Sequence, residues 1–372
     1  MAPDRTTGAE APPRDTAQTS DAAAAGERQQ RPRLADVAVA AGTSKPIASR
    51  ILNRDPTLSV RPELRERVIA AARELGYRPH AAARALRRSQ TSVLGMLVPP
   101  LLNPVYTLIV RGAFSRAAER EFTLLLAEDI EEQHADETFA QLVLTGRIDG
   151  LIVASARPGH PLIARLAEHG LPHVFANRAV EGSGRNVVMD DEHGVDVALD
   201  HLHLLGHRAI AHAGGPGSLD PARRRTEAFR RWHDRHGLDP SRIVEGDFLE
   251  SGGAAATAEL LRRWPDTTAI YTSSASQGIG AIHAAWELGL AVPRQLSILA
   301  AADMPLAAYL VPPLTSVTMP LFELGAAAVD ALISQIEAPA AAADAATPGN
   351  LVIETRPTLV VRGSTGPPPR LG

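Results

Sequence analysis

Residues 34–53 read LADVAVAAGTSKPIASRILN, and their apolar spacing predicts two short helices joined at Gly42. The apolar face of the first helix consists of Leu34, Val37, Ala38 and Ala41. In the second helix Ala48, Ile51 and Leu52 point inward at the same spacing. Ser44 is expected to cap the first turn of this helix. Two short helices joined by a tight glycine turn form a helix-turn-helix unit.

The outward side of the second helix and the segment after it are rich in basic residues. A third helix is predicted over 64–75, with Arg65, Arg67 and Arg73 on its outer face. Residues 31–90 hold 13 Lys and Arg against 5 Asp and Glu, whereas residues 91–372 hold 22 against 32. Charge alone leaves a merely solvated basic face open. Together with the helix-turn-helix pattern, it predicts a DNA-binding headpiece over 32–88.

Beyond the headpiece, short apolar runs alternate with amphipathic segments, which is typical of a parallel sheet covered by helices. The predicted strands are 93–98, 122–127, 150–154, 173–176, 186–189, 209–213, 269–272, 296–300 and 316–319. The predicted helices include 105–119, 195–205, 221–236, 254–263, 278–288 and 321–336. These strands are too many for one doubly wound sheet, so we expect two α/β subdomains with a ligand cleft between them.

Three headpiece stretches, LADVAVAAGTSKPIASRILN (34–53), RVIAAARELGYRP (67–79) and ARAL (83–86), resemble the lactose-repressor (LacI/GalR) family of bacterial transcription regulators. Shorter matches follow: Asn103 with Pro104, LGHR (205–208), EGDF (245–248), PLT (313–315) and LVVRGST (359–365). The resemblance implies an all-α headpiece on a body like periplasmic sugar-binding proteins. It also implies a transcriptional regulator, with repression the simplest outcome. Such a regulator binds a near-palindromic operator in double-stranded DNA as a homodimer, with a tetramer left open.

The expected domains follow from these matches. Residues 1–31 are interpreted as a disordered arm, 32–78 as the helix-turn-helix domain, and 79–90 as a hinge helix and linker. Residues 91–365 form the expected effector-binding and dimerisation domain. One subdomain covers about 91–191 plus 321–348, the other covers about 192–320 plus 349–365, and 366–372 are a frayed tail.

The resemblance assigns base reading in the major groove to Lys45, Pro46 and Arg50. An arginine can bond bidentately to guanine, whereas Pro46 offers only an apolar contact such as a thymine methyl. The operator is therefore expected to differ from those of relatives at that base. Phosphate contacts, which set register without reading sequence, are assigned to Ser44, Ser49 and Arg54.

The segment 80–88 corresponds to the hinge helix of the family. It is short and rich in alanine and arginine, so we expect it to fold only with DNA and a second subunit. The resemblance places Leu86, with Ala83 beside it, in the minor groove, where paired leucines kink the duplex. The alternative is that Leu86 packs on the body.

In the body, the resemblance aligns Arg223 with an arginine that grips effector hydroxyls or carboxylates. The alternative for Arg223 is one solvated arginine among several on its helix. Relatives commonly carry Asn and Asp where this chain has Ser274 and Ala302, and Asp303 alone does not restore the hydrogen bonds of that pair to a sugar ring. The effector is therefore expected to be an unidentified small molecule other than a sugar in the familiar pose, or to be absent. The remaining candidates for the cleft lining are Tyr106, Arg178, Ser218 and Gln277.

An enzyme is the first alternative. His201, His203 and His207 cluster in the sequence, but only the last two share a helical face, and no nearby carboxylate completes a metal motif. His207 is better interpreted as the structural histidine of a Gly-His turn. No phosphate-binding glycine loop and no nucleophile elbow occur, so neither catalysis nor a cofactor or metal is expected.

A secreted sugar-binding protein is the second alternative. Against it stand the headpiece and the lack of an apolar signal-peptide core near the N-terminus. The longest uncharged run, 89–110, is interrupted by prolines, so no membrane segment is expected. With no cysteine, disulfides are excluded. The expected location is the cytoplasm, at the nucleoid.

Overall fold

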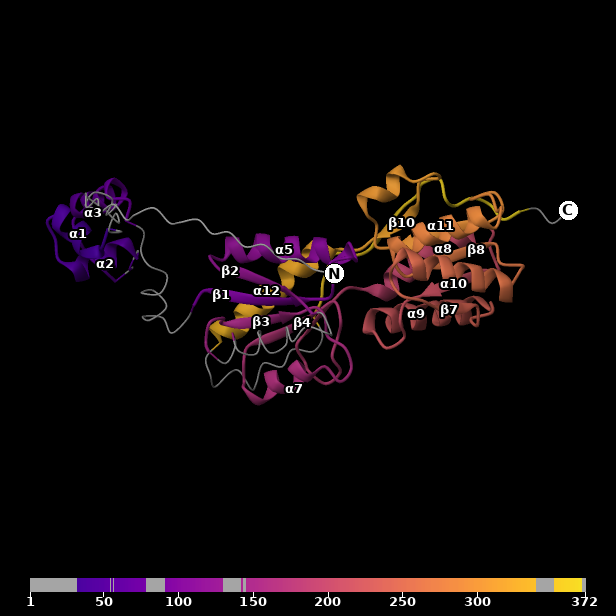
Figure 1. Ribbon diagram of the computed structural model, residues 1–372, viewed down its shortest axis with the longest axis horizontal. Coiled ribbons are helices and arrows are strands. Elements are labelled where there is room, and N and C mark those ends of the chain that lie inside the picture. Colours follow the sequence, from indigo (N-terminus) through magenta and orange to yellow (C-terminus); the bar gives the residue numbers. More distant parts are fainter. Residues whose placement is uncertain are drawn as a thin grey trace, which may run out of the picture. The chain divides into compact units, whose positions relative to one another are not determined.

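A computed structural model of the chain describes residues 32–53, 55, 57–77, 91–129, 142, 145–338 and 351–369. The expectations for the N-terminal arm, for Arg54, and for the hinge segment with Ala83 and Leu86 lie outside these residues. The chain divides into two compact units, one ending at Ala83 and one beginning at Arg84 (Figure 1). Each unit is described by itself.

The headpiece contains the three predicted helices, α1 (Leu34–Ala40), α2 (Lys45–Leu52) and α3 (Pro62–Glu74). Its core consists of Val37, Ala38, Ala41, Ala48, Ile51, Val68, Ala71 and Ala72. Gly42 adopts φ +65°, a left-handed conformation that lets the chain turn sharply between α1 and α2. Ser44 is the N-cap residue of α2, as predicted, although its side chain makes no capping hydrogen bond.

The first subdomain of the body is built on a parallel six-stranded sheet of order β11-β5-β4-β3-β1-β2 (Figure 1). Its strands are β1 (Val93–Val98), β2 (Thr123–Glu128), β3 (Gly150–Val153), β4 (His173–Ala176), β5 (Asn186–Val188) and β11 (Leu351–Val352). Helices α5 (Val105–Glu119) and α12 (Leu321–Glu337) pack together on one face, and α7 (Pro161–Glu168) covers the other.

Two glycines set how closely α5 and α12 approach. A Cβ atom on Gly325 would lie 1.9 Å from the Ile109 carbonyl oxygen, and one on Gly112 would lie 1.9 Å from the Phe322 carbonyl oxygen. Neither backbone can yield to such an overlap. The close crossing of α5 and α12 therefore requires glycine at both positions.

The second subdomain has a six-stranded sheet of order β12-β10-β9-β8-β6-β7, parallel except between β10 and β12. Its strands are β6 (Ile210–Gly214), β7 (Ile243–Glu245), β8 (Ala269–Thr272), β9 (Ser297–Ala301), β10 (Thr315–Thr318) and β12 (Thr358–Val360). Helices α8 (Asp191–Leu204) and α9 (Asp220–His236) cover one face. Helices α10 (Glu250–Arg263) and α11 (Ala275–Glu287) cover the other, and a short 3-10 helix, η1 (Pro305–Tyr309), follows β9.

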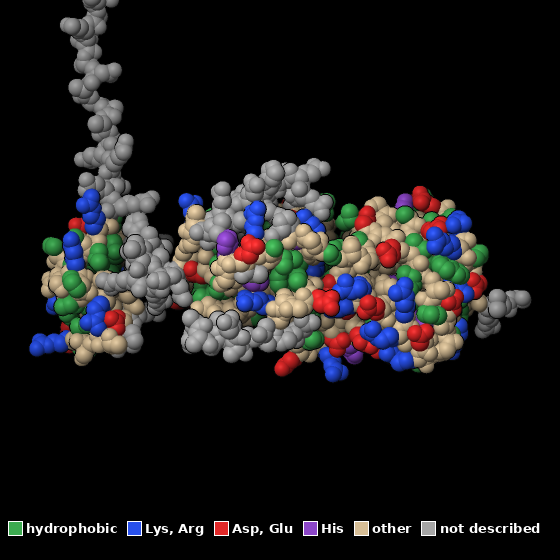
Figure 2. Space-filling model, turned by 90° about the horizontal axis from the view of Figure 1, so that it is seen from below, with side chains coloured by type: hydrophobic (Ala, Val, Ile, Leu, Met, Phe, Trp, Pro, Cys, Tyr) green, Lys and Arg blue, Asp and Glu red, His purple; other side chains and the backbone are tan. Residues whose placement is uncertain are grey.

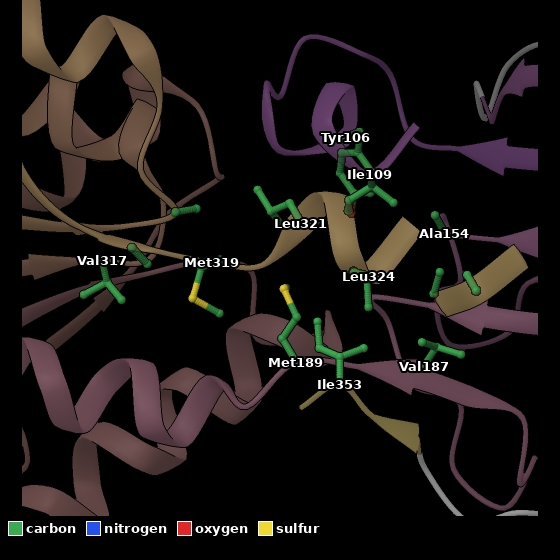
Figure 3. Packing of buried hydrophobic residues seen from close by; sticks show 14 of the residues in the cluster. Tyr106, Ile109, Ala154, Val187, Met189, Val317, Met319, Leu321, Leu324 and Ile353 are labelled. Atoms are coloured by element: carbon green, nitrogen blue, oxygen red, sulfur yellow. The ribbon is translucent and has the colours of Figure 1, made fainter. Parts of the chain in front are cut away.

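The chain passes between the subdomains after β5, after β10 and between β11 and β12. Met189 and Met319, on the first two crossings, point toward one another, and Ile353 on the third lies beside Met189 (Figure 3). The apolar core therefore continues through all three crossings. Flexible methionine side chains suit such a junction, because they fill irregular spaces.

The body confirms the predicted two-sheet α/β architecture and corrects three details. Strands β7, β11 and β12 were not predicted, because each is too short to show a period. Since β11 pairs with β5, Leu351 and Val352 belong to the first subdomain, and assigning all of 349–365 to the second was wrong. Gly366 is no frayed residue, because its carbonyl oxygen lies 2.9 Å from His207 Nε2 and its N–H donates to Ser297 Oγ.

Candidate DNA interface and effector cleft

The outward side of α2 carries the side chains that the sequence assigns to DNA. Lys45 and Pro46 are exposed in the first turn, and Lys45 has no hydrogen bond or ion pair with any residue that the structure describes. The exposed Ser44 hydroxyl, unused as a cap, can meet a phosphate. Ser49 is partly engaged, since Asn53 Nδ2 donates to its carbonyl oxygen at 2.8 Å and to its Oγ at 3.3 Å.

Arg50 is tied to the loop after α2, which the sequence did not predict. Its Nε donates to Asp55 Oδ2 at 2.7 Å, and its Nη2 donates to Thr57 Oγ1 at 2.9 Å. Thr57 in turn donates to Asp55 Oδ1 from its Oγ1 at 2.7 Å and from its N–H at 2.9 Å. These hydrogen bonds, from Thr57 first and then Arg50, lower the pKa of Asp55 to about 2. Arg50, Asp55 and Thr57 therefore form a closed network.

Two cavities lie between the subdomains of the body. The larger, of about 570 Å³, is lined by residues 156–160 after β3, 179–181 after β4, and Ser218, Asp220 and Arg223 at the start of α9. The smaller, of about 220 Å³, is lined by the start of α5 with Arg111, by Ser274–Ser276, by Ala302–Pro305 and by Leu321. The predicted effector residues are thus divided, with Ser218 and Arg223 in one cavity and Ser274 and Ala302 in the other.

The arginines of α9 differ sharply in environment. The Arg223 side chain is 51% exposed and pairs with Asp220 at 3.2 Å, so it lines the larger cavity from a solvated position. Arg225 is buried, and its Nε donates to Asp191 Oδ1 at 2.7 Å and its Nη1 to the Ser273 carbonyl oxygen at 2.6 Å. Burial lowers the pKa of Arg225, but the charge and hydrogen bond of Asp191, together with smaller contributions from Tyr271 and Tyr106, raise it, and the net shift is upward.

Arg225, not Arg223, is therefore the cation held inside the second subdomain beside the cleft, and the sequence interpretation missed it. A signal was present. Ala222, Arg225, Phe229 and Trp232 recur at intervals of three and four residues, and all four are buried on one face of α9.

Hydrogen bonds also join the subdomains directly. Asp220 Oδ2 accepts from the Ala179 N–H at 3.0 Å, and Arg224 Nη2 donates to the Asn177 carbonyl oxygen at 2.9 Å. Arg224 also pairs with the buried Asp191. Asp220 and Arg224, in the first turns of α9, thus bond the second subdomain to backbone groups that follow β4 in the first subdomain.

Three predicted lining residues belong to neither cavity. Tyr106 OH accepts from Arg178 Nε at 3.1 Å, and Arg178 Nη1 donates to the Ser155 carbonyl oxygen at 3.2 Å. Gln277 donates from Nε2 to the Gly214 and Asp247 carbonyl oxygens, both at 2.8 Å. All three side chains are buried and bonded within the protein.

Ser274 and Asp303, which lie where the chain differs from the family pattern, are also hydrogen-bonded within the protein. Ser274 caps α11 by accepting from the Gln277 N–H, and its hydroxyl donates to the Phe248 carbonyl oxygen at 2.8 Å. Asp303 is paired with Arg362 at 2.7 Å and hydrogen-bonded by Ser316. Burial raises the pKa of Asp303, but these bonds outweigh it and lower the pKa. Both Asp303 carboxylate oxygens are therefore already hydrogen-bonded within the protein.

Arg157 and His160, which line the larger cavity, form a cluster with the buried Asp129. Asp129 accepts from Arg157 Nη1 at 2.6 Å and lies 2.9 Å from His160 Nε2. Burial raises the pKa of Asp129, yet the hydrogen bond to His160 and the charge of Arg157 lower it to about 2. No local pattern predicts this cluster, because Asp129 comes from a different segment than Arg157 and His160.

Of the histidines considered as metal ligands, His207 has a structural role. His207 is buried, with Nδ1 2.8 Å from Thr268 Oγ1 and Nε2 2.9 Å from the Gly366 carbonyl oxygen, as expected for a structural histidine. Burial lowers its pKa. Among the described residues, no three His, Asp or Glu side chains are placed to hold a metal ion. None of the described helices is both long and apolar enough to span a bilayer.

Acidic and basic side chains intermix over the body on the face shown in Figure 2, and basic side chains lie along the headpiece. Exposed ion pairs also join α9 to α8, such as Arg231 with Glu192 at 3.0 Å and Arg235 with Asp196 at 2.6 Å.

Comparison with known proteins identifies both units. Residues 33–80 match the family model described as bacterial regulatory proteins, lacI family, and residues 199–365 match the periplasmic binding protein-like domain. The ribose operon repressor of Escherichia coli K12 is 31% identical over 337 residues, which cover 89% of this chain and 99% of that protein. The transcriptional regulator MalR of Streptomyces coelicolor is 32% identical over 355 residues, which cover 91% of this chain and 97% of that protein.

Solved structures agree. The lac repressor dimer bound to operator and the anti-inducer ONPF aligns with a TM-score of 0.77 at 27% identity, covering 91% of this chain and all of that chain. The transcriptional regulator CelR in complex with cellobiose aligns with a TM-score of 0.67 at 29% identity, covering 90% and 100%. These relatives are transcriptional regulators and not enzymes. On this evidence, the chain belongs to the lacI family of bacterial regulatory proteins.

Proposed function

We propose that this chain is a sequence-specific transcriptional repressor that binds a near-palindromic operator through α2. The observation that carries the proposal is the outward side of α2, where Lys45, Pro46 and Arg50 stand on a helix whose inner face is fixed by the headpiece core. Such a helix fits the major groove and presents side chains to base edges. The basic balance of residues 31–90 supplies the attraction to phosphates.

The active form that we propose is a homodimer. The lac repressor in the operator complex is a dimer, and twofold symmetry in the protein matches two half-sites of a near-palindromic operator. A tetramer would bring two such dimers together and is not needed for operator binding. The proposed location, the cytoplasm in contact with the nucleoid, follows from the DNA target.

We infer that a small molecule between the subdomains sets the affinity for the operator. The CelR complex holds cellobiose, which favours a sugar. In this chain, however, Ser274 and Asp303 are already bonded within the protein, and Ala302 has no polar side-chain atom. A sugar in the pose that depends on those positions would leave its hydroxyls unpaired. The effector therefore differs from a sugar in that pose, and the larger cavity is its candidate site.

No catalytic role is proposed, because the relatives are regulators and because His201 and His207 are hydrogen-bonded within the protein. The proposal is tested by selecting bound fragments of genomic DNA with the purified full chain and footprinting them. We expect a protected near-palindrome occupied by two chains. Binding without any sequence preference would contradict the proposal. Adding common sugars to the footprinted complex should leave it intact, and strong release by one of them would overturn the effector inference alone.

A further inference from the structure

We propose that Asp55 and Thr57 clamp Arg50 in the orientation that reads a base, which makes Asp55 a specificity-determining residue of the headpiece. The inference rests on the proposed function, since it assumes that α2 enters the major groove. Neither Asp55 nor Thr57 lies on α2, so both act through Arg50 and are positioning residues.

The clamp uses one edge of the Arg50 guanidinium and leaves the other free. Nε is bonded to Asp55 at 2.7 Å, and one N–H of Nη2 is bonded to Thr57 at 2.9 Å. The second N–H of Nη2 and the N–H groups of Nη1 form the end of the fork. Nη1 has no partner among the residues that the structure describes. Two parallel donors at this end match the O6 and N7 acceptors of a guanine.

The clamp also limits the motion of Arg50. An unrestrained arginine loses several rotamers when it docks, and that entropy is subtracted from the binding free energy. Here the Arg50 side chain is held before DNA binds. Thr57 donates to the Asp55 carboxylate, and that carboxylate accepts from Arg50. A preorganised pair of donors discriminates more strongly between bases, because the arginine cannot adopt another conformer that would bond a wrong base.

An ordinary surface ion pair is the competing explanation. The Arg50 side chain is 40% exposed and that of Asp55 is 28% exposed, and such pairs contribute little to stability. A carboxylate on a surface that binds a polyanion also weakens binding to every DNA sequence. If Asp55 has no other role, removing its charge strengthens all DNA binding equally. If it orients Arg50, the same change weakens sequence discrimination.

The test compares Asp55→Asn and Thr57→Val with Glu66→Gln in the full chain. Glu66 is exposed on α3, and its side chain has no hydrogen bond or ion pair with any described residue, so its variant matches the charge change alone. Dissociation constants are measured at one salt concentration for the selected operator, for random DNA, and for operators substituted at each base pair. We expect Asp55→Asn to lower the operator-to-random ratio about tenfold. The loss should concentrate at the base pair that Arg50→Ala identifies, with a smaller loss for Thr57→Val.

An equal change in affinity for all DNA would have the opposite meaning. If Asp55→Asn and Glu66→Gln raise the affinity for operator and random DNA by the same factor, with an unchanged base profile, the clamp has no part in reading and the inference is overturned. A wild-type chain that prefers no sequence would instead contradict the proposed function. The unfolding temperatures of the variants are measured alongside, and they should remain close to that of the wild type.

Discussion

The headpiece and the cleft of the body assemble their functional side chains in different ways. Every described candidate for DNA contact lies on or next to α2, within a single stretch of chain. The cleft draws on segments as far apart as Asn103 and Leu321. Its polar groups are also largely bonded to one another, whereas Lys45 and the free end of Arg50 remain available. The headpiece therefore presents side chains that are available to bind DNA. In the cleft, hydrogen bonds and ion pairs within the protein stabilise the present state.

The largest expected effect lies in the cleft. Asp191→Asn removes the carboxylate that pairs with the buried Arg225 and with Arg224. Leaving a buried cation uncompensated costs about 3 to 5 kcal/mol, so the free energy of unfolding should fall by that order. Arg223→Gln, on the exposed side of the same helix, is the control and should change it by less than about 1 kcal/mol. Equal effects of the two variants in urea unfolding would contradict the assigned environments.

Acidification should destabilise the body before the headpiece. His212 is fully buried between Phe229 and Tyr271, and burial lowers its pKa to about 4. An unfolded histidine titrates near 6.5, so protons bind the unfolded state preferentially between these values. The stabilisation is fully present above about pH 6.5 and declines toward pH 4, by about 3 kcal/mol from this group.

Residues 32–77 contain no histidine, so the helices of the headpiece lack this dependence. The measurement is unfolding followed at several pH values by a probe in each unit, with His212→Gln as the variant. A variant that keeps the full pH dependence would show that another group causes it.

The Arg50→Ala variant tests base reading by the headpiece. It removes a base contact without disturbing the headpiece core, so operator preference should fall by about 1 to 3 kcal/mol while weak, salt-sensitive binding remains. Gel-shift competition between operator and random DNA measures the change. The unfolding temperature should stay nearly constant. Unchanged discrimination would show that Arg50 does not read sequence.

The smallest expected effect concerns the exposed ion pairs of α9. Arg231 and Glu192 are each 48% exposed, and pairs of this kind contribute about 0 to 1 kcal/mol. Arg231→Ala should therefore shift the free energy of unfolding only slightly, and less in high salt. A loss comparable to that of Asp191→Asn would mean that exposure does not separate the two kinds of pair.

The sequence predicted local features well and distant ones poorly. The helices of the headpiece follow from Val37, Ile51 and Val68 at helical spacing, because packing and period reinforce each other there. The two-sheet body followed from alternating apolar runs. The two-residue strand β11 carries no period, and only its pairing with β5 reveals it.

The cleft was the least predictable part. Arg223 was favoured by alignment, but the inward period of α9 selects Arg225, which only burial makes plain. Asp129 and His160 lie far apart in the sequence, and only folding brings them into contact, so no local pattern predicts this pair. Asp55 lies close to Arg50 in the chain, yet a loop conformation, and not a helical spacing, brings them together.

The role of the headpiece is tested most directly by comparing DNA binding by the full chain with binding by residues 91–372 alone, using the selected operator and random DNA at one salt concentration. We expect the truncated body to fold with both sheets, as judged by circular dichroism, and to retain neither DNA. Undiminished binding by the folded body would contradict the assignment of DNA recognition to the headpiece.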